Sequence, residues 1–258
     1  MKLVSFLGVI KSVSYPIFTK KDEWTKLNNS EHTELQELKL ITDDVKDVRL
    51  SSTEMLVLKN NGDLFRYYMD ALDGVKVESN IKEIGKILLF DSIGLKEDGT
   101  LKLFMSDDRI RDTYADFRVE ANFDSIKYDL DVPILTKGSD EYAIFVNNST
   151  PHFENTDFFS DAKVITLHYD SGKVREIGYL QKINYDKFSK LGVGKIRYLS
   201  SDYLHSDRSK SGEKESYLQI IDEDNRGFLI NDKGEVVRKV EVVDKESIYQ
   251  ITDVRTLK

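Results

Sequence analysis

A short phrase that recurs along the chain constrains the fold more than any other feature of the sequence. It consists of two or three apolar residues, often a lysine, two polar residues, a glycine, and then apolar residues again. Its clearest copy is Leu56–Phe65. The other copies that contain the glycine are Ile93–Leu101, Ile134–Gly138, Leu167–Val174 and Phe228–Val236. Asp22 of a weaker copy and the glycines of the first four of these five copies recur every 34 to 40 residues, roughly, which is the kind of period that marks a repeat architecture.

The physical unit behind the phrase is a β-hairpin. Asn61-Gly62 and Asp98-Gly99 stand between apolar runs, and such pairs supply the positive φ angles that a tight type I′ turn requires. A second element, with apolar residues three apart, precedes several hairpins and is predicted to be a short strand that enters the core. Its copies are Val45–Ser52, Ile81–Ile84, Phe123–Ile126 and Val193–Ser201.

A hairpin unit repeated at this period predicts an all-β protein, and among such folds a single β-propeller over residues 1–258. The number of blades is six or seven, because the interval between Gly172 and Gly234 is too long for one unit and short for two. Within that interval the polar stretch Ser206–Glu215 is either a degenerate hairpin tip or an inserted loop. Evidence for helices is thin, and the best candidate is Glu31–Leu40.

The two ends of the chain are predicted to close the ring. Leu3–Ile10 is interpreted as a first strand, because Lys11 ends the apolar run and no cleavage site of a signal peptide follows. The hairpin near Asp22, at Ile17–Trp24, lacks the glycine and has no convincing strand element in front of it. Ile251–Leu257 is such an element without a hairpin after it. We therefore expect the C-terminal strand to complete the N-terminal blade and to hide its edge.

Composition narrows the class of function. The formal net charge is −8, with 46 acidic and 38 basic residues, which works against nonspecific binding to nucleic acid or to an anionic membrane. The chain has no cysteine, so disulfides, thiolate catalysis and cysteine-ligated metals are excluded, and a reducing compartment such as the cytoplasm fits. No apolar run is long enough to span a bilayer.

The Lys-x-x-Gly phrase and the preceding Val/Ile-x-x-Val/Ile strand resemble the repeats of the propeller family named after the regulator of chromosome condensation. The resemblance is clearest at Val45–Phe65 and Ile81–Leu103. The sequence departs from the family pattern at Ser51–Glu54 and Leu89–Ser92, where Gly-x-x-His is usual, and it lacks the Trp-Gly that commonly follows the hairpin. The resemblance implies a binding scaffold, because bacterial proteins of similar type tend to act through protein surfaces, in one case as an inhibitor of β-lactamase. It transfers no functional residue.

Motifs for metal or nucleotide chemistry are weak. None of the four histidines has another histidine at metal-ligand spacing, and His168 is predicted to be a partly buried strand residue. Gly192–Lys195 only faintly resembles a phosphate-binding loop and is predicted to be a turn before a strand. Asp222–Gly227 resembles the start of a calcium loop, but Arg226 and Lys233 occupy two ligand positions. The sequence therefore predicts no cofactor, no metal and no assignable catalytic residue. The four histidines are His32, His152, His168 and His205.

Carboxylates and aromatic side chains leave a carbohydrate-active alternative open. Paired acids of the kind that glycoside chemistry uses occur at Asp43-Asp44, Asp107-Asp108, and Asp129 with Asp131. Trp24, Tyr67, Tyr68 and Tyr114 are candidates for a sugar or protein platform, although most such residues pack between blades.

The leading functional hypothesis is a non-enzymatic, cytoplasmic protein-binding module, an adaptor or inhibitor that acts through a face or rim of the propeller and binds neither nucleic acid nor membrane. The composition suggests a bacterial or phage origin. The alternatives are a glycoside hydrolase or lectin-like propeller, and a structural component of a phage or secretion assembly.

Overall fold

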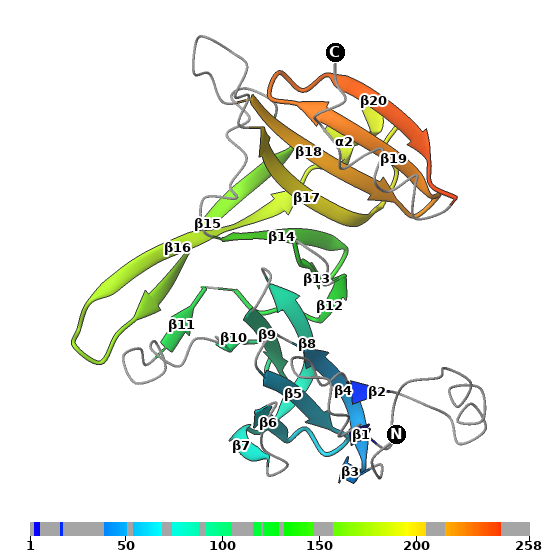
Figure 1. Cartoon of the computed structure of the whole chain (residues 1–258). Coiled ribbons are helices and arrows are strands. Elements are labelled where there is room, and N and C mark those ends of the chain that lie inside the picture. Colours follow the sequence, from blue (N-terminus) through cyan, green and yellow to red (C-terminus); the bar gives the residue numbers. More distant parts are fainter. Residues whose placement is uncertain are drawn as a thin grey trace, which may run out of the picture. The chain divides into compact units, whose positions relative to one another are not determined.

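The computed structural model describes residues 3–5, 16–17, 39–50, 54–68, 74–87, 91–104, 116–119, 121–128, 132–146, 157–204 and 215–243. These residues form an all-β structure of five antiparallel sheets (Figure 1), and the three or four strands of most of these sheets are consistent with the blades of a propeller. The chain divides into two compact units, residues 1–84 and 85–258, which are described separately. No helix in the described part of the chain is long and apolar enough to span a bilayer.

The first unit contains two sheets and the beginning of strand β8. The strand order of the first sheet is β2-β1-β3, and that of the second is β4-β5-β6-β7. The strands are β1 (Leu3–Ser5), β2 (Pro16–Ile17), β3 (Lys39–Thr42), β4 (Val45–Leu50), β5 (Glu54–Lys59), β6 (Leu64–Tyr68) and β7 (Val75–Glu78).

Strand β1 lies in the centre of its sheet, and this bears on the predicted ring closure. Val4 pairs with Ile17 on one edge and with Leu40 on the other. A C-terminal strand can therefore join this sheet only at the outer edge of β2 or β3. The expected closing strand, Ile251–Leu257, lies outside the described residues, as does most of the expected hairpin Ile17–Trp24.

The second unit contains three sheets, with the strand orders β10-β9-β8, β11-β15-β16-β14-β13-β12 and β17-β18-β19-β20. The strands of the first two sheets are β8 (Ile81–Ile87), β9 (Asp91–Lys96), β10 (Leu101–Phe104), β11 (Asp116–Arg118), β12 (Ser125–Tyr128), β13 (Ile134–Lys137), β14 (Asp140–Val146), β15 (Phe159–His168) and β16 (Val174–Ile183). Helix α2 (Tyr185–Lys190) leads into the third sheet, which consists of β17 (Ile196–Leu204), β18 (Glu215–Asp222), β19 (Arg226–Asn231) and β20 (Val236–Glu241).

The sheets of the second unit pack face to face through side chains that alternate along each strand. In β14, Ala143 and Phe145 belong to the hydrophobic cluster shared with the β17–β20 sheet and Phe188 of α2. Ile144 and Val146 belong to the cluster shared with β9 and β10. Successive side chains of a strand point to opposite faces, so the middle sheet buries both of its faces. This packing of successive sheets is what the repeat predicts.

The repeated hairpins are confirmed, but the predicted type I′ turn is wrong at Gly62 and Gly99. Gly62 and Gly99 have φ angles of 85° and 84°, whereas Asn61 and Asp98 do not have positive φ. Gly62 N donates to Lys59 O at 3.1 Å, and Lys59 N donates to Asp63 O at 2.9 Å. This is a type I turn followed by a bulge at the glycine. The extra residue explains why the glycine is third, not second, in the connection.

The residue with positive φ in this turn also links one sheet to the chain that enters the next. Its carbonyl oxygen accepts a hydrogen bond from Ile81 N at Gly62 (2.9 Å) and from Phe123 N at Gly99 (2.8 Å). In the β17–β20 sheet the matching residue of the turn is Asn225, whose φ is 61° and whose carbonyl accepts from Val242 N, just after β20, at 2.7 Å. We call this residue the sheet-linking position.

Two copies of the phrase therefore do not mark blades of their own. The turn at Gly234 joins β19 to β20, so the counterpart of Gly62 in that sheet is Asn225. The turn at Gly172 joins β15 to β16, and β16 pairs with β14 in the same sheet as the Gly138 turn. The prediction that the hairpin at Gly172 is a repeat unit of its own is therefore wrong. The polar stretch 205–214, outside the described residues, connects β17 to β18, whose last described pair is Leu204 with Glu215.

Helix α2 was not predicted. It has only six residues, which is too short for a helical period to be recognised in the sequence. Gly192, with φ of 79°, follows its end, and the predicted turn at Gly192–Lys195 is confirmed because β17 begins at Ile196.

Candidate functional site

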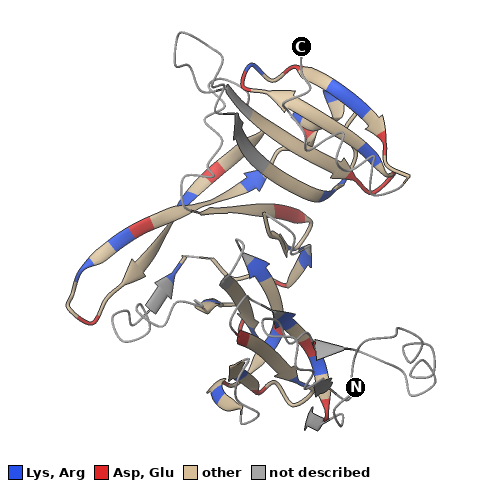
Figure 2. Ribbon diagram, viewed as in Figure 1, with Lys and Arg blue, Asp and Glu red and all other residues tan. Residues whose placement is uncertain are grey.

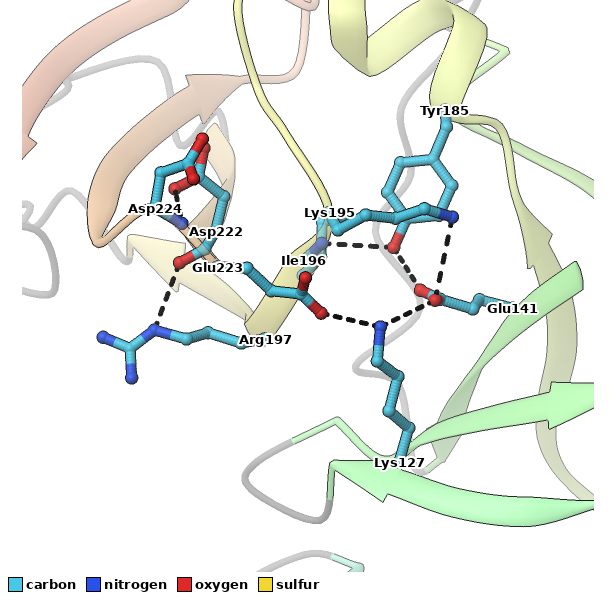
Figure 3. A network of polar contacts seen from close by, with 9 residues as sticks. All are labelled: Lys127, Glu141, Tyr185, Lys195, Ile196, Arg197, Asp222, Glu223 and Asp224. Carbon is cyan, nitrogen blue, oxygen red and sulfur yellow. Dashed lines mark hydrogen bonds and ion pairs between the residues drawn. The ribbon is translucent and has the colours of Figure 1, made fainter. Parts of the chain in front are cut away.

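A buried ionic centre of the second unit surrounds Glu141, at the start of β14. Its side chain is only 8% exposed, and its two oxygens contact three other side chains (Figure 3). Oε1 lies 2.8 Å from Lys127 Nζ and 3.7 Å from Lys195 Nζ, while Oε2 accepts a hydrogen bond from the Tyr185 hydroxyl. We refer to Glu141, Lys127, Tyr185, Lys195 and Glu223 as the Glu141 cluster.

Lys127 connects two sheets. It lies on β12, and its ammonium group is 2.8 Å from Glu141 Oε1 and 2.8 Å from Glu223 Oε1. Glu223 belongs to the β18–β19 turn of the neighbouring sheet. Burial disfavours the charged form of Lys127, but its hydrogen bonds with the two carboxylates raise its pKa above the usual value. The lysine therefore stays protonated and holds the two acids together.

Tyr185 and Lys195 join the helix and the start of β17 to the same centre. The Tyr185 hydroxyl donates to Glu141 and accepts from Ile196 N at 3.1 Å. Burial, and then the hydrogen bond to Glu141, raise the pKa of Tyr185 well above its usual range. Lys195 Nζ lies 3.9 Å from the centroid of the Tyr185 ring, a cation–π contact, and its carbonyl accepts from Glu223 N at 2.7 Å.

Asp222, next to this cluster, is completely buried and supports the β18–β19 turn. Its Oδ1 accepts from the backbone N–H groups of Asp224 and Arg226, and its Oδ2 accepts from Gly194 N at 3.0 Å and Arg226 Nε at 2.8 Å. Burial opposes its charge, yet these hydrogen bonds lower the pKa of Asp222. The carboxylate that resembled a calcium ligand is thus occupied by Arg226 and by backbone donors.

A second feature of the unit is the long hairpin β15–β16, which we call the arm (Figure 1). The pairs Val164 with Tyr179, Thr166 with Glu176 and His168 with Val174 are directly opposite each other, so they share one face. We define these six residues as the arm face. Ile165 and Leu167, which alternate with them, are buried in the cluster shared with β9 and β10.

The arm face combines exposed apolar groups with polar groups that are already oriented. Val164 and Val174 are 44% and 53% exposed. His168 Nε2 lies 3.1 Å from Thr166 Oγ1, and a hydrogen bond to Glu176 raises the pKa of Tyr179. The prediction for His168 as a partly buried strand residue is confirmed. Sequence reasoning missed the arm face, because its members become neighbours only through the pairing of two strands.

The other predicted candidates do not gather at one place in the described structure. Tyr67 is a core residue at 6% exposure, and Asp43 is an exposed loop residue 4.0 Å from Lys59 Nζ. No group of three His, Asp or Glu residues within the described ranges could hold a metal ion. The candidates that lie outside the described residues are Trp24, His32, Asp107, Asp108, Tyr114, Asp129, Asp131, His152 and His205.

Neither a protein-family model nor a curated protein matches the sequence, so membership of the family of the regulator of chromosome condensation has no support. Solved structures give distant similarities to a β-rich fold. One is a chain of the S. cerevisiae complex of a Dbp5 variant with Nup159, a Gle1 variant, IP6 and ADP, at 13% identity and a TM-score of 0.34. The other is the N-terminal domain of Nup159, at 12% identity and a TM-score of 0.27.

Each of these similarities covers 83% of this chain and 56% of the other chain. The protein therefore spans about half the length of the chains that it resembles, and scores this low assign no function to it. The class that its own structure defines is an all-β protein of antiparallel sheets.

Proposed function

We propose that this protein is a non-enzymatic protein-binding module that contacts its partner through the arm face. The observation that carries the proposal is the pair of exposed valines, Val164 and Val174, on one face of a long hairpin whose other face is buried. Exposed apolar side chains flanked by polar groups are typical of protein interaction sites. Tyr179 on the same face is of the type that contributes strongly to binding.

The Glu141 cluster favours a structural role over a catalytic one. The two carboxylates that it brings together, Glu141 and Glu223, are both held by Lys127. A glycosidase pair instead needs one acid that gives up a proton and one that attacks or activates water. The cluster supplies rigidity to the scaffold, and the arm supplies the surface for recognition.

The architecture that we propose for the whole chain is a single propeller with a closed ring. Support comes from the sheet-linking position: Gly62 and Gly99 bind the residue that begins the next sheet, and Asn225 binds Val242 in the same way. By this correspondence, the chain after Val242 enters a further sheet. We propose that Ile251–Leu257 adds to the outer edge of β2 or β3. A disulfide formed between a cysteine placed in this segment and one placed in β2 or β3 would test the closure.

Affinity capture with matched variants tests the function. We expect wild-type protein to retain one stoichiometric partner from lysate, as identified by mass spectrometry. Val164→Asp with Val174→Asp should abolish that capture, while the same change at Val75, which is 58% exposed in the first unit, should preserve it. Capture that survives the arm substitutions would overturn the role of the arm face. A stoichiometric glycan ligand, found in place of a protein, would favour the carbohydrate alternative.

A further inference from the structure

Strand β20 is the outermost strand of its sheet and has a neighbour, β19, on only one side within the described residues. Exposure alternates along it. Lys239 and Glu241 are exposed, and they are flanked by Val237 and Val243, which are 40% and 75% exposed. Lys239 and Glu241 pair with Phe228 and Arg226 of β19 and are spaced two apart, so their side chains lie on one face of the sheet. Basic and acidic positions follow each other along this edge (Figure 2).

The backbone of β20 is oriented for pairing on its outer side. In an antiparallel pair, alternate residues direct both their N–H and their C=O to the same neighbour. Val242 N donates to Asn225 O at 2.7 Å, and Val240 pairs with Gly227 of β19, so the even-numbered residues face β19. Lys239 and Glu241 therefore direct their N–H and C=O groups away from the sheet.

Two copies of this edge are complementary to each other when they run antiparallel. If a second copy of the strand runs antiparallel across a two-fold axis at Val240, Lys239 faces the partner's Glu241, and Glu241 faces the partner's Lys239. Opposite charges placed directly across an antiparallel pair are attractive. A two-fold axis also makes both subunits use the same patch, as most homodimers do.

The charges select this register over its neighbours. An axis at Lys239 would place that lysine opposite its own copy, and an axis at Glu241 would do the same for the glutamate. An axis between Arg238 and Lys239 would place two basic residues opposite each other. Like charges at directly opposed positions are destabilising, so only the axis at Val240 satisfies both ionic positions.

We propose that β20 pairs with β20 of a second copy of this chain, with the axis at Val240, and forms an eight-stranded sheet across a homodimer. Lys239 Nζ lies 5.2 Å from the centroid of the Phe228 ring, and Phe228 is directly opposite Lys239 on β19, so this contact orients the lysine side chain at the edge of the sheet. The bulge at Val236 and Val237, where the register with β19 shifts, limits the pairing at one end. This edge is distinct from the arm face, so the dimer would leave the proposed partner surface accessible.

Charge exchange tests the proposal on the full chain. Sedimentation velocity over a range of protein concentrations should show wild-type protein approaching twice the 29.8 kDa mass of the chain. Lys239→Glu or Glu241→Lys alone creates two like-charge pairs and should raise the dissociation constant about tenfold or more. The double variant, with both exchanges, should dimerise as the wild type does.

Mixing the two single variants supplies a further readout. One subunit then presents two acids and the other two bases, so a heterodimer should form where neither variant dimerises alone. Lys233→Glu, the same charge change at an exposed residue of the β19–β20 turn, is the matched control and should leave the wild-type dimer intact. A wild-type protein that stays monomeric would overturn the proposal. A dimer indifferent to both single exchanges would do so as well.

Discussion

The ammonium group of Lys127 lies 2.8 Å from Glu141 Oε1, although the two residues come from different strands and the carboxylate is almost fully buried. The same ammonium group contacts Glu223 at the surface of the next sheet. The Lys127 ammonium group thus connects a buried carboxylate, Glu141, with an exposed one, Glu223. We expect the two carboxylates to contribute unequally to the free energy of unfolding.

Removing the charge of Glu141 should cost far more than removing that of Glu223. Glu141→Gln leaves Lys127 and Lys195 with one fewer anion in a buried setting, and we expect the free energy of unfolding to fall by about 2 kcal/mol or more. Glu223 is 43% exposed, so Glu223→Gln should cost about 0–1 kcal/mol. Urea unfolding of the two variants measures the difference, and equal losses would contradict the ranking.

The stabilisation from Asp222 should depend on pH in one direction. Its folded-state pKa lies below the ordinary value of 3.8, so its contribution is fully present above that value and is lost as the pH falls through the folded pKa. Asp222→Asn should therefore lower stability by about 3 kcal/mol at neutral pH, and the gap to wild type should shrink below pH 3.8. Thermal unfolding at several pH values checks this. A gap that widens in acid would refute the assignment.

These two acids also show where sequence reasoning stops. The local sequence already argued against a calcium loop at Asp222–Gly227, because Arg226 and Lys233 stand in ligand positions, and the structure pairs Arg226 with Asp222. The Glu141 cluster was not found. Its members come from β12, β14, α2, the start of β17 and the β18–β19 turn, and no spacing along the chain reveals contacts set by the packing of two sheets.

Gly178 should tolerate no side chain. A Cβ at this position would lie 1.9 Å from Phe145 O, on the neighbouring strand β14. This oxygen is a backbone atom of a paired strand, so it cannot move aside as the end of a flexible side chain can. We expect Gly178→Ala to cost about 3 kcal/mol or more. Gly138→Ala is a useful comparison because nothing lies within 4 Å of its Cβ, and only its φ of 59° opposes the change, at about 1–2 kcal/mol. Chemical denaturation of both variants gives the ranking, and the reverse order would contradict it.

The sheet-linking positions should differ in their tolerance of asparagine. Asn225 shows that asparagine can adopt the required positive φ. At Gly62 the nearest atom to a new Cβ is Ile81 O at 3.4 Å, whereas at Gly99 it is Phe123 O at 2.9 Å. Gly62→Asn should therefore cost about 1 kcal/mol or less, and Gly99→Asn clearly more. Melting temperatures of the two variants decide the order, and Asn225→Gly should be close to neutral.

The fold was predictable to the extent that it is encoded locally. Apolar alternation and turn glycines located the strands on both sides of Gly62, Gly99 and Gly138, and the element before each hairpin became an edge strand of its sheet. The blade count was not predictable in this way. The same turn chemistry serves at Gly172 and Gly234, where it joins other strands of a sheet, and only pairing partners distinguish these positions. Asn225 takes the glycine's place with no sequence signature.

The sheet-linking hydrogen bond has a consequence for engineering. The carbonyls of Gly62 and Gly99 bind the chain that enters the next sheet, and the carbonyl of Asn225 binds Val242 after β20, so the chain between each carbonyl and its donor is anchored at both ends. The number of residues between carbonyl and donor differs from sheet to sheet, and a foreign peptide grafted between β19 and β20, at the Gly234 turn, would start and end at anchored points. We therefore expect the β19–β20 hairpin to accept and present an inserted peptide.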